Sequence, residues 1–212
     1  RTIKGSLGDY SASMMSDDNS IYQYGYFYSN DLQFDSTANY TSERLLNSKG
    51  SRDIYLAKYS GQTLNLDWIK HVGGIADDAA TGIFTYEDKI YLTGYFSNQV
   101  FFGSDTLYTS GTLNRDPFIS IINTEGDFIN SNNIVGLGNY QDIGHAIVVD
   151  QFSNVHISGT YKSEYLLIND DSLFNEHVGD QNMFLAKYGC LPISITSENP
   201  TDAICNTANE GG

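Results

Sequence analysis

Short stretches in which apolar and polar residues alternate recur along this chain, and such alternation predicts β-strands. Three of these stretches share a glycine followed by two aromatic or polar residues: Ile21–Phe27, Ile90–Phe96 and Val155–Tyr161. Their glycines, Gly25, Gly94 and Gly159, recur at steps of 69 and 65 residues. No stretch of 12 residues has convincing helical periodicity. We therefore expect an all-β chain built from internal repeats.

Two further landmarks keep nearly the same period. The first is a second strand-like segment that follows each glycine: Asp53–Tyr59, Asp116–Ile122 and Asn182–Tyr188. The second is an aspartate about 16 residues before each glycine: Asp9, Asp78 and Asp142. Each aspartate precedes a short apolar run and then a polar turn, and apolar alternation on both sides of such a turn predicts a hairpin.

Each repeat is predicted to hold about four short strands. In the second repeat the four strands are expected near residues 81–86, 89–96, 116–123 and 130–135, with an additional hairpin over Val100–Thr109. Four strands in a repeat of this length match a β-propeller blade. The chain divides into a partial blade at 1–9, units at about 9–74, 75–138 and 139–189, and a remainder at 190–212.

Three blades do not close a propeller ring, which typically needs four to eight. We therefore expect about three four-stranded antiparallel blades of a larger propeller, with the other blades missing from this chain. An open stack of repeats is the alternative. The abrupt start at Arg1 and the lack of a signal peptide are interpreted as a missing N-terminus.

Composition narrows the class of partners. The formal net charge of -15 disfavours contact with nucleic acids and anionic membranes. No apolar run is long enough for direct membrane insertion. The 16 tyrosines and 11 phenylalanines suit strands, and exposed ones could form a sugar-stacking or adhesive surface.

The two cysteines, Cys190 and Cys205, both lie in the polar segment 190–212. That segment is expected to be a linker or the start of a following module. The pair could form one disulfide in an extracellular protein, or remain two thiols. A disulfide framework does not hold the repeats together, because residues 1–189 contain no cysteine.

Candidate catalytic or metal-binding groups are few. Asp9, Asp78 and Asp142 could be ligands or catalytic carboxylates, but recurrence in every unit favours a structural role, since catalysis needs such a group once. His145 and His156 are expected on adjacent strands of one hairpin, without the further ligands that zinc requires. The acidic turn at Asp17–Asn19 could hold Ca²⁺, yet no calcium-loop motif is present. No cofactor is therefore expected.

Enzyme signatures are missing from the sequence. Nucleophile-elbow, phosphate-loop and dinucleotide motifs do not occur, nor does the aspartate box of sialidases. The sequence thus predicts a non-catalytic protein. The alternative is a carbohydrate-active enzyme, a glycosidase-type propeller, whose site lies in blades absent from this chain.

The repeat motifs resemble the bacterial seven-bladed β-propeller repeat called SBBP. The resemblance covers residues 3–189, and its motifs are DIYLAKY at 53–59, WIKHVGG at 68–74, IYLTGYF at 90–96 and DIGHAIVVD at 142–150. The pattern also implies that Trp68 is a blade core residue. The second unit departs from it at Pro117 and Ile122, which predicts an edge or a looser third strand.

The segment Ile193–Gly212 weakly resembles the start of an immunoglobulin-like repeat of Bacteroidota surface adhesins. Together the resemblances imply a secreted or cell-surface protein, exported by the type IX route, that acts as a scaffold or adhesion module. Its partners would be other surface proteins or glycans.

O-linked glycosylation is expected at three repeated hydroxyls: Ser36, Thr106 and Ser172. Each follows an aspartate, and the triplets resemble the O-glycosylation signal of exported Bacteroidota proteins. Because aspartate followed by serine or threonine also favours a hairpin turn, the same residues have a purely structural interpretation. Asn39–Thr41 fits the N-glycosylation pattern but occurs once, and the implied source disfavours it.

Overall fold

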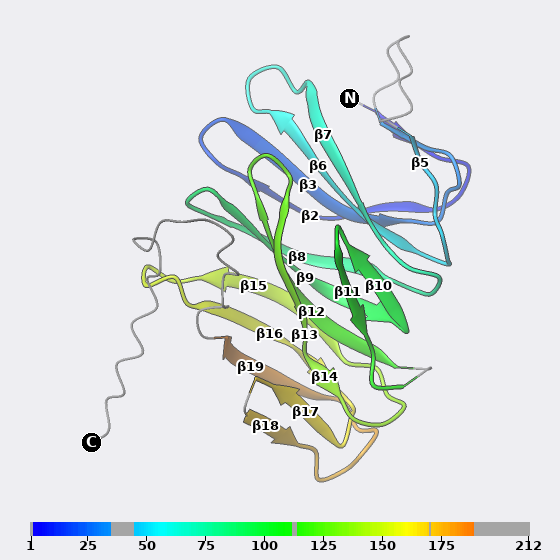
Figure 1. Cartoon of the computed structure of the whole chain (residues 1–212), viewed down its shortest axis with the longest axis vertical. Helices are drawn as coiled ribbons and strands as arrows, with labels where there is room; N and C mark the ends of the chain where they lie inside the picture. The colour runs from blue at the N-terminus through cyan, green and yellow to red at the C-terminus, as the bar shows by residue number, and fades with distance from the viewer. Residues whose placement is uncertain (1, 35–44, 112–113, 170, 189–212) are drawn as a thin grey trace.

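The computed structural model of the chain is all-β (Figure 1). It describes residues 2–34, 45–111, 114–169 and 171–188, which form 19 strands in six sheets. Every strand pair inside these sheets is antiparallel, and none of the described sheets closes on itself. The all-β prediction is therefore confirmed.

Each repeat unit forms one main sheet. The first sheet has the order β2-β3-β6-β7, with strands β2 (Asp9–Ser16), β3 (Ser20–Phe27), β6 (Asp53–Ser60) and β7 (Leu66–Val72). The second has the order β8-β9-β12-β13, with strands β8 (Ala79–Tyr86), β9 (Lys89–Ser97), β12 (Arg115–Asn123) and β13 (Phe128–Asn133). The third has the order β15-β16-β19 among the described residues, with strands β15 (Ile143–Val149), β16 (Val155–Tyr161) and β19 (Asn182–Tyr188). The four strands predicted for the second unit are confirmed.

A small hairpin interrupts each main sheet after its second strand. In the second unit it is β10 (Gln99–Phe102) with β11 (Asp105–Tyr108), as predicted. The corresponding pairs are β4 (Leu32–Phe34) with β5 (Leu45–Leu46) and β17 (Tyr165–Ile168) with β18 (Asp171–Phe174). Short strands from the end of the preceding unit, β1 (Ile3–Lys4) and β14 (Val135–Gly136), pair with β4 and β17. These pairings tie the first and third units to the preceding segment, and a single bridge between Gly73 and Phe101 does so for the second.

The repeated glycine marks a point where three strands approach closely. A Cβ on Gly25, Gly94 or Gly159 would lie 2.1 Å from a carbonyl oxygen of the first strand. It would also strike the aromatic ring directly opposite on the third strand: Tyr55, Phe118 or Phe184. Only a hydrogen fits there, which explains why the residue recurs. The first strand has a register shift beside each glycine.

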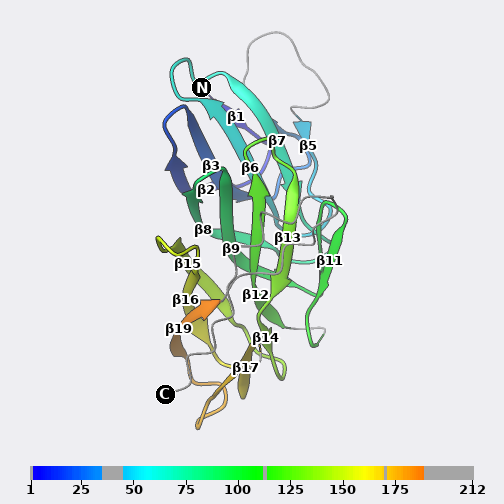
Figure 2. The ribbon, with the colours of Figure 1, turned by 60° about the vertical axis from the view of Figure 1, so that its left-hand side comes forward.

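The three main sheets follow one another along the long axis of the molecule (Figure 1) and pack face to face. One cluster, which includes Leu56 and Ile83, lies between the first and second sheets. A second cluster, which includes Ile119 and Ile147, lies between the second and third. The first strands β2, β8 and β15 run along one side (Figure 2), and β8 contacts both of the others.

Trp68 packs partly buried against the first of these clusters, which agrees with the core position that the resemblance implies. Its indole nitrogen donates a hydrogen bond to the carbonyl oxygen of Thr124 in the next unit, at 3.1 Å. The tryptophan therefore also links two units.

Pro117 does not mark an edge strand, so the edge alternative is wrong, whereas the pairing of the third strand with β13 does shift in register between Ile121 and Ile122. Pro117 lies in β12, between β9 and β13. The carbonyl oxygen of Pro117 accepts a hydrogen bond from Ile134, just past the end of β13, at 2.8 Å. In an antiparallel ladder the N–H and the C=O of one residue point to the same neighbouring strand. Because the carbonyl of Pro117 points towards the end of β13, the missing N–H lies on that side too, and the pairing of β12 with β9 is unaffected.

Candidate functional site

The recurring aspartates hold the start of each first strand to the end of the second. In the third unit, Oδ1 of Asp142 accepts hydrogen bonds from the backbone N–H groups of Lys162 at 2.7 Å and Ser163 at 3.2 Å. Asp9 bonds Tyr28 and Ser29 in the same way. Their structural role is therefore confirmed by geometry that repeats from unit to unit.

Asp78, the equivalent residue of the second unit, bridges two units. Its carboxylate accepts the N–H of Gly74 at 2.8 Å and that of Ser97 at 3.2 Å. Burial raises its pKa to about 7, against the effect of these hydrogen bonds, and the charges of Asp53 and Asp77 add to the rise. The joint between the first two units thus encloses a carboxyl group that titrates near neutrality.

The joint between the second and third units also encloses such a carboxyl group, although it belongs to Asp116, the equivalent of Asp53 and not of Asp78. Burial, together with the charge of Asp142, raises the pKa of Asp116 to about 7, against the effect of the hydrogen bond from the backbone of Gly136. Oδ2 of Asp116 and Oδ1 of Asp53 are buried without a hydrogen-bond partner among the described residues. Since burying a carboxylate oxygen without a partner is costly, the protonated form of Asp116 is favoured.

A charged cluster of Arg52, Asp77 and Arg115 lies beside these joints. Nε and Nη2 of Arg52 each lie 2.5 Å from an oxygen of Asp77, and Nη2 of Arg115 lies 2.8 Å from Asp77 Oδ2. The ring of Tyr95 lies 5.5 Å from the Arg52 guanidinium and 4.7 Å from that of Arg115. Burial on its own raises the pKa of Asp77, but the hydrogen bonds and charge of Arg52 lower it overall.

Tyrosines extend this cluster onto the surface of the first unit. The rings of Tyr10 and Tyr26 stack at 5.0 Å, and the ring of Tyr28 meets that of Tyr10 edge-on at 6.5 Å. The Arg52 guanidinium lies over both Tyr26 and Tyr28, at 5.1 and 5.7 Å. Tyr10 is 51% exposed. We call Tyr10, Tyr26, Tyr28 and Arg52 the tyrosine–arginine surface; sequence reasoning did not identify it.

A signal for part of this arrangement is present in the sequence. Arg52 and Arg115 each directly precede an aspartate that opens a third strand, and Asp77 directly precedes the repeated Asp78. Backbone bridges place Arg52 beside Asp77 and Arg115 beside Gln141. Charged residues at matching repeat positions could therefore have indicated contacts between units.

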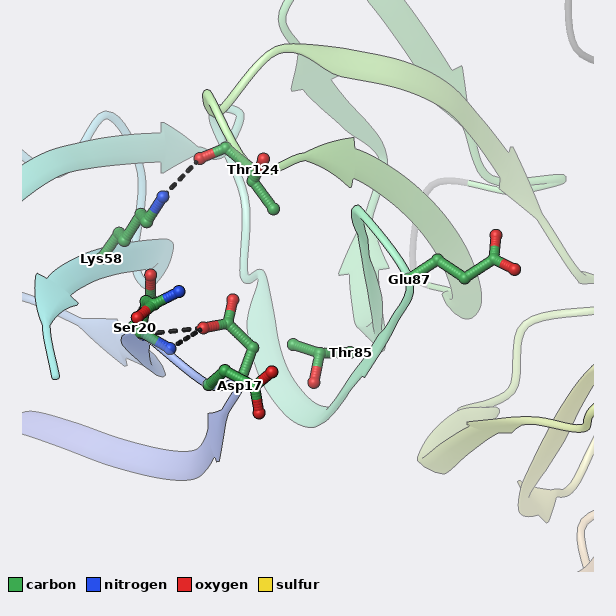
Figure 3. A pocket seen from close by; sticks show the side chains of 8 residues that line it. Asp17, Ser20, Lys58, Thr85, Glu87 and Thr124 are labelled. Atoms are coloured by element: carbon green, nitrogen blue, oxygen red, sulfur yellow. Dashed lines mark hydrogen bonds between the residues drawn. The ribbon is translucent and has the colours of Figure 1, made fainter.

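An open depression of about 480 Å³ lies between the first and second units at the opposite end of the sheets (Figure 3). Its lining is polar and includes Asp17, Lys58, Glu87 and Thr124. Lys58 donates to the carbonyl oxygen of Thr124 at 2.9 Å (Figure 3). The depression is thus partly closed by a contact between units.

In the acidic turn at this depression, both carboxylate oxygens of Asp17 accept hydrogen bonds from nearby residues of the same hairpin. Oδ1 of Asp17 accepts the backbone N–H groups of Asn19 and Ser20, at 2.9 and 2.7 Å. Its Oδ2 accepts the hydroxyl of Tyr22 at 2.9 Å. The turn is an ordinary aspartate-capped hairpin, and Asp150 caps the corresponding turn of the third unit.

The two candidate histidines lie on β15 and β16, the adjacent strands that were predicted. They have different partners, because His145 bonds Thr160 at 3.1 Å and His156 bonds Asp150 at 3.1 Å. Within the part of the chain that the structure describes, no group of three or more His, Cys, Asp or Glu side chains could hold a metal ion.

Two of the three predicted glycosylation residues are described. Thr106 is half-buried and Ser172 is exposed, and each is the second residue of its hairpin's returning strand, β11 or β18. They pair across the hairpin with Phe101 and Leu167. Ser36, Cys190 and Cys205 lie outside the described residues.

Comparison of the chain with protein-family models and with curated proteins gave no match. A search of the described residues for helices long and apolar enough to cross a membrane found none.

Proposed function

We propose that this chain is a segment of a β-propeller of the SBBP type and that it serves as a non-catalytic scaffold on a secreted or cell-surface protein. The observation that carries the proposal is the repetition of one structural joint. Aspartates at the same place in each unit accept backbone hydrogen bonds. An aspartate that makes the same kind of hydrogen bonds in every unit favours a structural role, since an active site would need such a group only once.

The packing of the three sheets also supports a propeller. Their first strands contact one another in succession, while the remaining strands extend away from that line (Figure 2). Radial repetition of four-stranded sheets produces such contacts between first strands. The packed sheets would then form a rigid scaffold that holds loops and exposed side chains in position to bind partners.

The tyrosine–arginine surface is the best candidate for contact with a glycan or another surface protein. Tyr10 offers an exposed aromatic ring, and Arg52 supplies hydrogen-bond donors next to it. Aromatic rings and arginine are enriched where proteins bind partners. We therefore propose that the scaffold's binding surface lies beside the joint between the first two units.

A glycan array and a glycoside hydrolase screen on the same preparation test this proposal. Binding without turnover is expected, and Tyr10→Ala should reduce the signal at least about fivefold, as loss of one aromatic contact would. The control is Tyr108→Ala, because Tyr108 is 61% exposed but lies away from this surface on β11. Turnover that is lost on substitution of a carboxylate within residues 1–189 would contradict the non-catalytic proposal.

A further inference from the structure

The two joints between the main sheets contain equivalent arginines, since Arg52 and Arg115 occupy the same position in the first and second units. Each guanidinium lies over a tyrosine ring of its own sheet, at 5.1 Å from Tyr26 for Arg52 and at 4.7 Å from Tyr95 for Arg115. A backbone bridge places each arginine beside the residue that precedes the first strand's aspartate in the next unit. The two joints can therefore be compared position by position.

The residue that faces the arginine across the joint differs between the two joints. Asp77 faces Arg52 and accepts hydrogen bonds from its Nε and Nη2, each at 2.5 Å. Gln141 faces Arg115, and its Oε1 lies 3.4 Å from Nη1, which is long for a hydrogen bond. The second joint thus has a neutral amide at the position where the first joint has a carboxylate.

Arg115 compensates in part by sharing the carboxylate of the first joint. Its Nη2 lies 2.8 Å from Oδ2 of Asp77, so two guanidinium groups share one acid. Since arginine stays protonated, one of the two positive charges is not balanced by Asp77. Neighbouring carboxyl groups are directed into the joints instead, where they are 0% exposed and accept backbone hydrogen bonds: Asp78, Asp116 and Asp142.

We propose that Arg115 binds the carboxylate of an acidic sugar, which takes the place opposite Arg115 that Asp77 takes opposite Arg52. The inference rests on the glycan-binding role proposed above and names the class of glycan. The side chain of Arg115 is 27% exposed, and Gln141 beside it is exposed, so a ligand can reach the guanidinium. A carboxylate fits its fork with two parallel hydrogen bonds, and the amide of Gln141 offers further donors to the sugar.

A continuous row of rings and guanidinium groups connects Arg115 with the tyrosine–arginine surface. From Arg115 the row passes to Tyr95 at 4.7 Å and then to Arg52 at 5.5 Å. It continues to Tyr26 at 5.1 Å and ends at the exposed ring of Tyr10, 5.0 Å further on. We expect Tyr10 to contact the apolar face of a sugar ring and Arg115 to contact a carboxylate of the same oligosaccharide.

Calorimetric titration of the full chain with a matched pair of sugars tests the proposal. One probe is a trisaccharide with a single glucuronic acid, and the other is the same trisaccharide with that carboxyl reduced to an alcohol. The wild-type chain should bind the acidic probe at least about tenfold more tightly. Arg115→Gln should abolish this preference without changing the affinity for the neutral probe.

The charge-matched control is Lys89→Gln. Lys89 pairs with Asn123 at the opposite end of the contact between β9 and β12, whereas Arg115 pairs with Ser97. This variant loses the same charge away from the proposed position, so it should keep the preference for the acidic probe.

Gln141→Asp provides a second variant, because it supplies the carboxylate from the chain itself. The new side chain should pair with Arg115 as Asp77 pairs with Arg52, raise the melting temperature by about 2–4 °C and abolish the preference for the acidic probe. Gln141→Asn is the neutral control and should change neither quantity. The melting temperature is measured without ligand, so it tests the unfilled acid position independently of any sugar.

Circular dichroism of each variant establishes that it is folded before binding is interpreted. Equal wild-type affinity for the two trisaccharides, or a preference that survives in Arg115→Gln or Gln141→Asp, would overturn the inference and leave the glycan-binding role standing. An acidic tetrapeptide that binds as tightly as the acidic trisaccharide would also overturn it, since the carboxylate would then belong to a protein. Binding of neither trisaccharide would instead contradict the glycan-binding role itself.

Discussion

Arg52 and Asp77 form a two-pronged ion pair across the joint between the first and second units, with both nitrogen–oxygen distances at 2.5 Å. The two residues are 25 positions apart in the chain. Each is mostly shielded from solvent, with side-chain exposures of 16% and 22%. The pair thus holds two independent sheets in a defined orientation, and the fork of the guanidinium matches the carboxylate.

Loss of this pair should loosen the joint. Arg52→Ala is expected to lower the free energy of unfolding by about 2 kcal/mol, since Asp77 would lose a charged hydrogen-bond partner in a shielded site. Arg52→Lys keeps the charge but not the fork, so its loss should be smaller. Chemical denaturation measures both variants. A change below about 0.5 kcal/mol for Arg52→Ala would show that the pair contributes nothing measurable.

The close approach at the repeated glycine predicts a large effect from one methyl group. In Gly94→Ala the new Cβ would lie 2.1 Å from the carbonyl oxygen of Ala79, a backbone atom that cannot swing away. We expect a loss of more than about 3 kcal/mol, or failure to fold. Gly8→Ala is the control, because its Cβ would meet only the end of the Tyr10 side chain, at 3.3 Å. Equal stability of the two variants would contradict the packing argument.

The buried carboxyls predict that stability falls as the pH rises towards neutrality. Burial raises the pKa values of Asp78 and Asp116 from 3.8 to about 7, so the folded state binds these protons more tightly than the unfolded state. Their contribution is fully present below the unfolded pKa and is lost as the pH rises through the folded pKa. Each carboxyl should account for a loss on the order of 4 kcal/mol between the unfolded and the folded pKa.

Denaturation at a series of pH values between about 5 and 8 measures this loss. Asp116→Asn should reduce the slope by about half, because the amide does not ionise while Asp78 still does. The exposed Asp88→Asn is the charge-matched control and should leave the slope as it is. A wild-type profile that rises over this interval would contradict the prediction.

Glycosylation at the inter-strand hairpins predicts a heavier protein from the native source. Ser172 is exposed and Thr106 is half-buried, so an attached sugar can reach solvent at both positions. Intact-mass analysis should show added sugar on the native protein and none on protein made in a host that lacks the transferase. Peptide mapping should assign the sugar to Ser172 and Thr106. An unmodified native mass would exclude the modification.

The sequence alone determined the repeats, the strands and the hairpins between them. Alternation of apolar and polar residues and the chemistry of short turns act within a few residues, so they can be read along the chain. The recurrence of Gly25, Gly94 and Gly159 with a second segment at nearly the same period indicated equivalent positions in successive repeats. The edge strand expected at Pro117 was wrong, because the sequence does not show which end of a ladder a missing N–H faces.

Only the tertiary structure determined which side chains meet across the joints. Arg52 and Asp77 belong to different sheets, and the packing angle of those sheets brings the two charges together. The same packing buries Leu56 and exposes its equivalent Leu185, although both are leucines in matching strands. The burial of a side chain, its hydrogen-bond partners and its pKa depend on which residues of other strands and sheets pack against it. The alternation of apolar and polar residues along one strand does not show which residues those are.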